Sequence, residues 1–218
     1  NNNTNGALVT DATHYVTVGT TEWITTQSFC MRIKYFHDNL DSDKYLFSTY
    51  SGSNYMRMRA LTTGLIDFQC KVGGVKYISL TCTNIAANKI VAGTWNDIII
   101  CIDRENEIGK IYLNGVKLRT SFNIVTANDV SFAGEVYHLM CFEYDHTGST
   151  GKLEKFEIYD GVISDAAAYN IYLGLDDVKC FNNTGGILQV TDSDYSTAQA
   201  NKYLDCFDKK IYSDIRDY

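Results

Sequence analysis

The sequence predicts an all-β fold in which two antiparallel sheets pack as a sandwich, with short helices only toward the C-terminal end. Segments of alternating apolar and polar residues recur every 8 to 15 residues up to about residue 159, and such alternation is typical of half-buried strands. The 218 residues include 16 Tyr, 10 Phe and no Pro. Of the 26 acidic residues only 7 are Glu. Asp favours turns and aromatic residues favour strands, so this composition agrees with the alternation.

Each strand is predicted from its own alternation. Over 65–72, for example, apolar residues alternate with Asp67, Gln69 and Lys71, so that one face of the strand is apolar and the other is polar. We expect the apolar face of each strand to point into the core. The predicted strands are 15–18, 28–36, 44–50, 55–61, 65–72, 75–80, 97–103, 110–114, 116–120, 136–143 and 152–159.

The strongest local signal is the Asn-Gly pair at 114–115, between two apolar segments. Asn-Gly favours a two-residue type I′ turn, because both residues tolerate positive φ. Such a turn pairs Leu113 with Val116. Two residues further from the turn, Ile111 faces Leu118, and all four side chains are expected on one face.

A short helix is predicted near 164–173, where the alternation has ended. Ser164 followed by Asp165 is a helix-start pattern, because a serine side chain at the N-cap accepts a hydrogen bond from the first turn. We expect Ile171 and Tyr172 to face the core.

A second helix is predicted near 196–212. Ser196 and Gln199 have the spacing of a capping box. No low-complexity linker or repeat divides the chain, so we expect one domain over 1–175 and a C-terminal extension over 176–218, packed on that domain or on a neighbouring subunit. The apolar stripe expected to make that contact is Ala200, Leu204, Phe207 and Ile211.

Charge and hydropathy exclude two classes of partner. The formal net charge of −7 disfavours binding to a phosphate backbone, so no nucleic-acid partner is expected. No run of about 18 apolar residues is present, so no membrane insertion is expected. The Asn-rich N-terminus does not have the pattern of a signal peptide.

The seven cysteines are an odd number, so they cannot all pair within one chain. Most lie in apolar strand-like segments, where a free cysteine behaves as a small hydrophobic residue. Cys70 and Cys82 would not face each other if Gly73-Gly74 forms a two-residue turn. We therefore predict reduced, structural thiols and folding in a reducing cytoplasm.

Three segments of the sequence carry a family resemblance. They are SFCMRIK at 28–34 with YLFS at 45–48, GTWNDIII at 93–100 with GKIYLNG at 109–115, and GKLEKFEIY at 151–159 with VISDA at 162–166. Together they resemble the laminin-G-like (LamG-like) members of the concanavalin A-like jelly-roll superfamily, over roughly residues 13–173. The resemblance implies a two-sheet jelly-roll sandwich whose loops or concave face often bind carbohydrate, lipid or protein. It does not specify a ligand, because a fold alone does not give function.

The paired-carboxylate motif of jelly-roll glycoside hydrolases is absent from the sequence. These enzymes use two strand-borne carboxylates on one face, as nucleophile and acid. Glu154 and Glu157 are three residues apart, a spacing that sends them to opposite faces of a regular strand. Glu105 and Glu107 have the right spacing but lie in a predicted loop. We therefore expect no enzyme activity.

Candidate ligand-binding residues are tyrosines in loops and a pair of arginines. Tyr50, Tyr55 and Tyr144 can present exposed rings for sugar stacking. Arg57 and Arg59 alternate along one strand face, where two guanidinium groups can bind acidic sugars or other carboxylates.

Calcium is the one metal that the sequence raises. Many LamG-like domains hold one Ca²⁺ at a loop edge, and Asp38, Asp41 and Asp43 offer carboxylates within six residues. The segment does not fit an EF-hand loop, and solvated turns in a β protein are the favoured interpretation of it. Trp23 and Trp95 are expected in the core or at a sheet edge.

The leading functional prediction is a non-catalytic recognition or adhesion module that binds a carbohydrate or cell-surface receptor. Reduced cysteines, no signal peptide and a binding fold agree if the protein belongs to a phage or viral particle, as a fibre, spike or decoration protein. One alternative is a structural capsid or tail protein without sugar binding, which contacts other virion subunits or forms a homo-oligomer. Another is a secreted LamG-like module from a larger cell-surface protein.

Overall fold

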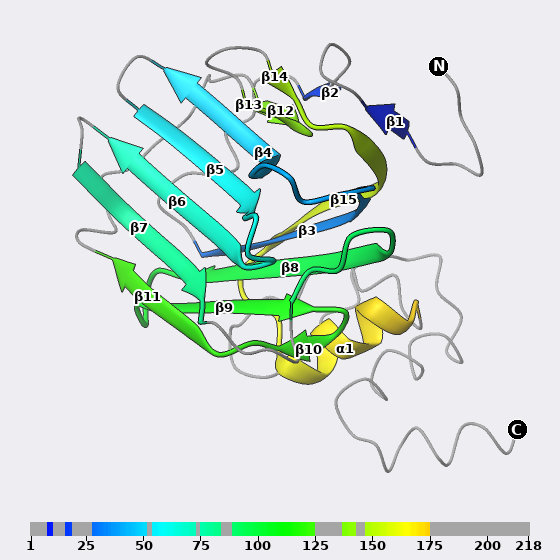
Figure 1. Ribbon diagram of the computed structural model, residues 1–218. Helices are drawn as coiled ribbons and strands as arrows, with labels where there is room; N and C mark the ends of the chain where they lie inside the picture. The colour runs from blue at the N-terminus through cyan, green and yellow to red at the C-terminus, as the bar shows by residue number, and fades with distance from the viewer. Residues whose placement is uncertain are drawn as a thin grey trace, which may run out of the picture.

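The computed structural model describes residues 8–10, 16–18, 28–51, 54–72, 75–83, 89–124, 137–142 and 147–174. Within these ranges the protein has two antiparallel sheets packed face to face and one helix (Figure 1). The prediction of an all-β sandwich of the jelly-roll type is confirmed.

The first sheet has six strands and joins segments from both ends of the described chain. Its central strands pair along their full length, with Phe29 opposite Ile102 and Phe36 opposite Trp95. In spatial order the strands are β1 (Leu8–Thr10), β15 (Gly151–Asp160), β3 (Phe29–Phe36), β8 (Trp95–Asp103), β9 (Ile108–Leu113) and β10 (Val116–Lys117).

The second sheet has seven strands, of which β4 to β7 follow one another as hairpins (Figure 1). A short two-stranded ribbon, β13 (Cys141–Phe142) and β14 (Thr147–Gly148), continues from its β12 end. In spatial order the seven strands are β11 (Thr120–Ile124), β7 (Val75–Cys82), β6 (Ile66–Val72), β5 (Asn54–Ala60), β4 (Lys44–Ser51), β12 (Tyr137–Leu139) and β2 (Val16–Val18).

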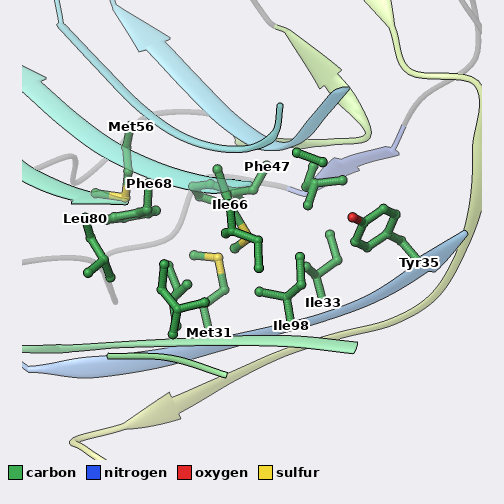
Figure 2. Close-up of a cluster of buried hydrophobic side chains, with 14 of the residues drawn as sticks. Met31, Ile33, Tyr35, Phe47, Met56, Ile66, Phe68, Leu80 and Ile98 are labelled. Carbon is green, nitrogen blue, oxygen red and sulfur yellow. The ribbon is translucent and has the colours of Figure 1, made fainter. Parts of the chain in front are cut away.

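The hydrophobic core lies between the two sheets (Figure 2). Alternation explains its composition, because every second residue of a strand faces the opposite sheet. The six-stranded sheet contributes Met31, Ile33, Tyr35 and Ile98, and the seven-stranded sheet contributes Phe47, Met56, Ile66, Phe68 and Leu80.

Two predicted strands differ from the structure. The segment 136–143 is not one strand, because Met140 has φ 58° and separates β12 from β13. The segment 116–120 contributes only the short β10, and the chain then crosses at Leu118 to the other sheet as β11.

The predicted turn at 114–115 is confirmed, with φ 51° at Asn114 and 77° at Gly115. Leu113 pairs with Val116, as predicted. Val116 is 49% exposed, however, so only the other three of the four predicted side chains are in the core. The side chain of Val116 lies at the sheet edge, beyond the reach of the opposite sheet.

Helix α1 (Asp165–Leu173) covers the outer face of the six-stranded sheet, on the side away from the seven-stranded sheet (Figure 1). Its start is as predicted, since the Ser164 side chain accepts a hydrogen bond from the Ala167 amide at 3.1 Å. Ile171 is buried, but Tyr172 is 40% exposed, so the prediction that Tyr172 faces the core is wrong. The predicted helix near 196–212 lies outside the described residues.

Arg32 joins the helix to three strands beneath it. Its guanidinium donates to Asp97 at 2.7 Å, to Glu157 at 2.8 Å and to the Ile171 carbonyl at 3.1 Å. Burial alone lowers the pKa of Arg32, but hydrogen bonds and the charges of Asp97 and Glu157 outweigh it and raise that pKa above its ordinary value. Arg32 therefore stays charged where the helix meets the sheet.

Cys30 and Cys101 form a disulfide between the neighbouring strands β3 and β8, with their Cα atoms 4.1 Å apart. The prediction of reduced thiols is wrong for this pair. Both lie under α1 on the outer face of the sheet, and their separation of 71 residues gave no sign of the strand register that brings them together. Cys70, Cys82 and Cys141 are free and buried, as predicted.

Candidate functional site

The outer faces of the two sheets differ in what covers them. On the six-stranded sheet, the outer-facing residues Ile99 and Tyr112 are buried against Ala168 and Ile171 of α1. The outer face of the seven-stranded sheet carries polar side chains instead, and no helix of the described residues covers it (Figure 1). This second face is the candidate site.

Strand register arranges the polar side chains of this face in rows that cross the sheet. Core residues such as Met58 and Phe68 point inward, so their neighbours along the strand point outward. One row consists of His138, Ser48, Arg57, Gln69, Ser79 and Asn123, each opposite the next. The adjacent row consists of Tyr45, Arg59, Asp67, Thr81 and Ser121.

The β12 end of the first row is closed. Ser48 is buried, and its hydroxyl donates to the Cys141 carbonyl at 2.6 Å. His138 is also buried, as expected for a strand histidine. The accessible part of the face therefore extends from β5 to β11.

Asp67 organises the second row. It is 2% exposed, and its carboxylate accepts hydrogen bonds from Arg59 at 2.7 Å, Thr81 at 3.0 Å and the Gln69 amide at 3.1 Å. Arg59 also contacts Asp43 at 3.0 Å. Burial lowers the pKa of Arg59, but Asp67 and Asp43 outweigh it and raise that pKa. The charge of Arg59 is therefore neutralised within the protein.

Arg57 differs from Arg59 because it contacts no carboxylate among the described residues. Its Nη2 donates to the Gln69 side-chain oxygen at 2.9 Å. Its guanidinium carbon lies 4.4 Å from the centre of the Tyr55 ring. The Nε atom of Arg57 is buried without an acceptor in this part of the chain. Among the described residues, no carboxylate therefore compensates the charge of Arg57.

Gln69 connects the two rows in a fixed orientation. An ionised carboxylate only accepts hydrogen bonds, so the Gln69 amide nitrogen must face Asp67. The Gln69 oxygen then accepts from both Arg57 and the Tyr55 hydroxyl, the latter at 3.2 Å. Asp67 thereby positions the first row as well as the second.

Of the three tyrosines predicted to bind a ligand, the structure describes the side chain of Tyr55 only. Tyr55 lies in β5, not in a loop, and its ring contacts both Arg57 and the Lys71 ammonium, which is 5.7 Å from the ring centre. Tyr50 lies opposite Tyr55 in the strand register. The side chain of Tyr50 and the whole of Tyr144 lie outside the described residues, so their role stays a prediction.

The three candidate calcium ligands each lie in a different setting. Asp41 pairs with Lys44, whose hydrogen bond and charge lower the pKa of that carboxyl. Asp43 is held by Arg59 and the Thr62 amide, and Asp38 is exposed. Within the described ranges, no group of three or more His, Cys, Asp or Glu side chains is arranged to hold a metal ion. Calcium binding stays a prediction.

Glu154 and Glu157 do not take opposite faces as predicted. A register shift between Leu153 and Lys155 places both carboxylates beside basic residues of β3, with Glu154 on Lys34 at 2.9 Å. Burial raises the pKa of Glu157, but hydrogen bonds from Tyr159 and Arg32 outweigh it and lower that pKa. A glycosidase acid requires a raised pKa, so Glu157 does not have the property of such an acid.

A laminin-G family model of the concanavalin A-like lectin/glucanases superfamily matches residues 10–168. The chain belongs to this superfamily. No curated protein sequence matches this chain significantly.

Solved structures that are similar to this chain include carbohydrate-binding domains. One is domain 4 of AbnA, an extracellular arabinanase from Geobacillus stearothermophilus, in complex with arabinotriose (TM-score 0.58, 14% identity, 76% of each chain). Another is the CBM40 of a Ruminococcus gnavus IT-sialidase bound to α2,3 sialyllactose (0.56, 18%, 77% of this chain and 100% of that one). A third is the binding domain of botulinum neurotoxin serotype G (0.56, 13%, 77% and 42%). At these identities the likeness concerns the fold.

The candidate face contains residues that the sequence did not single out as functional. Asp67, Gln69 and Lys71 were predicted to share a polar strand face, but nothing in the sequence marked that face as one that no described helix covers. Trp95, predicted in the core or at an edge, begins β8 at 37% exposure and contacts Phe36. Trp23 lies outside the described residues. No helix within the described ranges has the length and apolar character that crossing a membrane requires.

Proposed function

We propose that this chain is a non-catalytic carbohydrate-binding module whose ligand lies on the outer face of the seven-stranded sheet. The observation that carries the proposal is the group of polar and aromatic side chains on this face, which no described helix covers. Tyr55, Arg57 and Gln69 are mutually hydrogen-bonded or stacked. Saccharide sites combine aromatic rings with oriented polar groups in this way.

The relatives in structure support the class of ligand. The arabinanase domain binds arabinotriose and the sialidase module binds sialyllactose, and both share the sandwich of this chain. The absence of catalysis is proposed because both carboxylates of β15 are engaged by basic side chains, Glu154 by Lys34 and Glu157 by Arg32. Sustained release of reducing sugars from a polysaccharide panel, abolished by one Asp or Glu substitution, would contradict it.

The experiment is a glycan array followed by calorimetric titration of the best saccharide. Replacing Tyr55 with Ala and Gln69 with Ala should each weaken binding at least tenfold, because each removes a contact at the centre of the face. The matched control is Tyr169→Ala, an exposed ring on α1 at the other side of the sandwich, which should bind like the unaltered protein. Failure of the unaltered protein to bind any saccharide would refute the proposal.

We infer that the module works outside the cell or on a particle surface. The Cys30–Cys101 disulfide argues against the prediction of a reducing cytoplasm, because disulfides persist in oxidising compartments. Membership of a phage or viral particle depended in part on reduced cysteines, so it stays a prediction with less support than before. The same disulfide supports the alternative of a secreted module from a larger cell-surface protein.

A further inference from the structure

We propose that the saccharide bound on this face is acidic and that Arg57 binds its carboxylate. This inference rests on the proposed function and specifies the ligand class of the same site. It begins from a contrast between two arginines of one strand, Arg57 and Arg59, which lie two residues apart on the same face.

The charge of Arg59 is already balanced by two carboxylates. Asp67 and Asp43 take its two Nη groups at 2.7 and 3.0 Å, and Asp67 also accepts from its Nε at 3.2 Å. A ligand carboxylate approaching Arg59 would therefore compete with two carboxylates that are already in place.

The charge of Arg57 is not balanced by a carboxylate among the described residues. Gln69 provides the one hydrogen-bond acceptor that Arg57 meets among the described residues, and that acceptor is neutral. An arginine carries five N–H donors in a planar fork that matches a carboxylate in a bidentate arrangement. Stacking on Tyr55 holds the guanidinium plane in place, so little side-chain freedom remains to be lost on binding.

The surroundings of Arg57 add positive charge. Lys71 reaches the same Tyr55 ring, forms no ion pair with another described residue, and lies opposite Lys76 in the strand register. The whole chain has a net charge of −7, so the two basic side chains of Arg57 and Lys71 at one tyrosine ring run against the general charge of the molecule. Such a concentration of positive charge attracts an anion, and this attraction becomes weaker as salt is added.

The test compares saccharides that differ only in their acid group. The probes are sialyllactose and trigalacturonic acid, each paired with its own methyl ester, titrated calorimetrically at 50 and 500 mM NaCl. At least one acid should bind tenfold or more tightly than its neutral counterpart at low salt, with a smaller preference at high salt. A sulfated lactose that bound as tightly as the acids would show selection for charge without selection for a carboxylate, and would overturn the assignment of a carboxylate.

Variants assign the preference to Arg57. Arg57→Gln should abolish the preference for the acid, and Arg57→Lys should restore only part of it, because an ammonium group has no bidentate fork. The control is Lys155→Gln, which removes one exposed positive charge from the six-stranded sheet and should leave the preference unchanged. Melting temperatures of all three variants verify folding.

The outcomes separate this inference from the function on which it rests. Equal binding of acid and neutral probes, or an acid preference that survives Arg57→Gln in a folded protein, overturns the inference. If the protein binds saccharides in either of these ways and Tyr55→Ala abolishes that binding, the carbohydrate-binding function stands. Absence of binding to every saccharide overturns both.

Discussion

At the scale of single residues, buried polar groups determine how the protein responds to pH. His37 is fully buried, and its ring lies edge-on to Tyr35 at 4.7 Å. Neither ring nitrogen has a hydrogen-bond partner within the described residues. Burial, with a smaller effect of the Lys44 charge, lowers the pKa of His37 from 6.5 to about 4. The folded protein therefore holds this ring neutral.

We expect the free energy of unfolding to fall as the pH is lowered from about 6.5 to 4. The unfolded chain binds a proton at His37 in this range whereas the folded chain does not, so acid favours unfolding. The difference in pKa corresponds to about 3 kcal/mol, fully lost below pH 4 and fully regained above 6.5. Urea unfolding at intervals of half a pH unit measures it.

The variant His37→Phe isolates this contribution from that of the carboxyl groups. It keeps an aromatic ring beside Tyr35 but cannot bind a proton, so its stability should depend less on pH over the same range. Parallel pH profiles of variant and unaltered protein would show that His37 titrates normally in the folded state.

At the scale of elements, the turn at Asn114-Gly115 has two reasons to require glycine. Gly115 has φ 77°, a conformation that other residues adopt at a cost. A Cβ atom there would also lie 2.9 Å from ring atoms of both Tyr169 and Tyr172 in α1. The turn between β9 and β10 is thus also a surface on which the helix packs.

A comparison of two glycines separates strain from steric contact. Gly93 has a similar φ of 74°, but a Cβ there would meet nothing within 4 Å. Gly93→Ala should cost about 1 kcal/mol from backbone strain alone, and Gly115→Ala should cost clearly more. Equal losses in urea unfolding would mean that the two tyrosines move aside without cost.

The elements also show where prediction from the sequence succeeds. Alternation depends only on local spacing, so it located most strands and placed Arg57 and Arg59 on one face. It could not give the register between paired strands. The register of the β5–β6 hairpin decides that Asp67 neutralises Arg59, whereas Gln69 is the one hydrogen-bond acceptor that Arg57 meets among the described residues. The same missing information concealed the pairing of Cys30 with Cys101.

At the scale of the whole molecule, the Cys30–Cys101 disulfide closes a loop of 71 residues that includes β4 to β7. Constraint of the unfolded chain by a loop of this length corresponds to about 4 kcal/mol in the chain-entropy model. The double variant Cys30→Ala and Cys101→Ala should therefore lose stability in urea unfolding by up to this amount.

The control for the disulfide is Cys70→Ala, which removes a buried free thiol and leaves the loop closed. It should lose stability by an amount that does not depend on reductant, whereas the unaltered protein should lose stability when reductant is added to the unfolding buffer. Indifference of the unaltered protein to reductant would mean that the bond is not formed in solution.

The C-terminal extension gives a second prediction at this scale. We expect truncation after Thr191 to destabilise the domain, because the predicted stripe of Leu204, Phe207 and Ile211 requires burial and an isolated helix of that length is marginal in water. Thermal unfolding and sedimentation of both forms measure it. A truncated protein that keeps its stability but changes from oligomer to monomer would place the extension on a neighbouring subunit.

Coverage of one sheet by α1 has a consequence for valency. A sandwich has two outer faces, and the helix occupies one of them, so the described part of each chain presents a single face to a ligand. Through that face alone, one copy of the chain can mask a glycan but cannot bridge two glycan-coated particles. Cross-linking by this face would require several copies held together, and the avidity would then depend on the spacing between copies more than on any contact within one site.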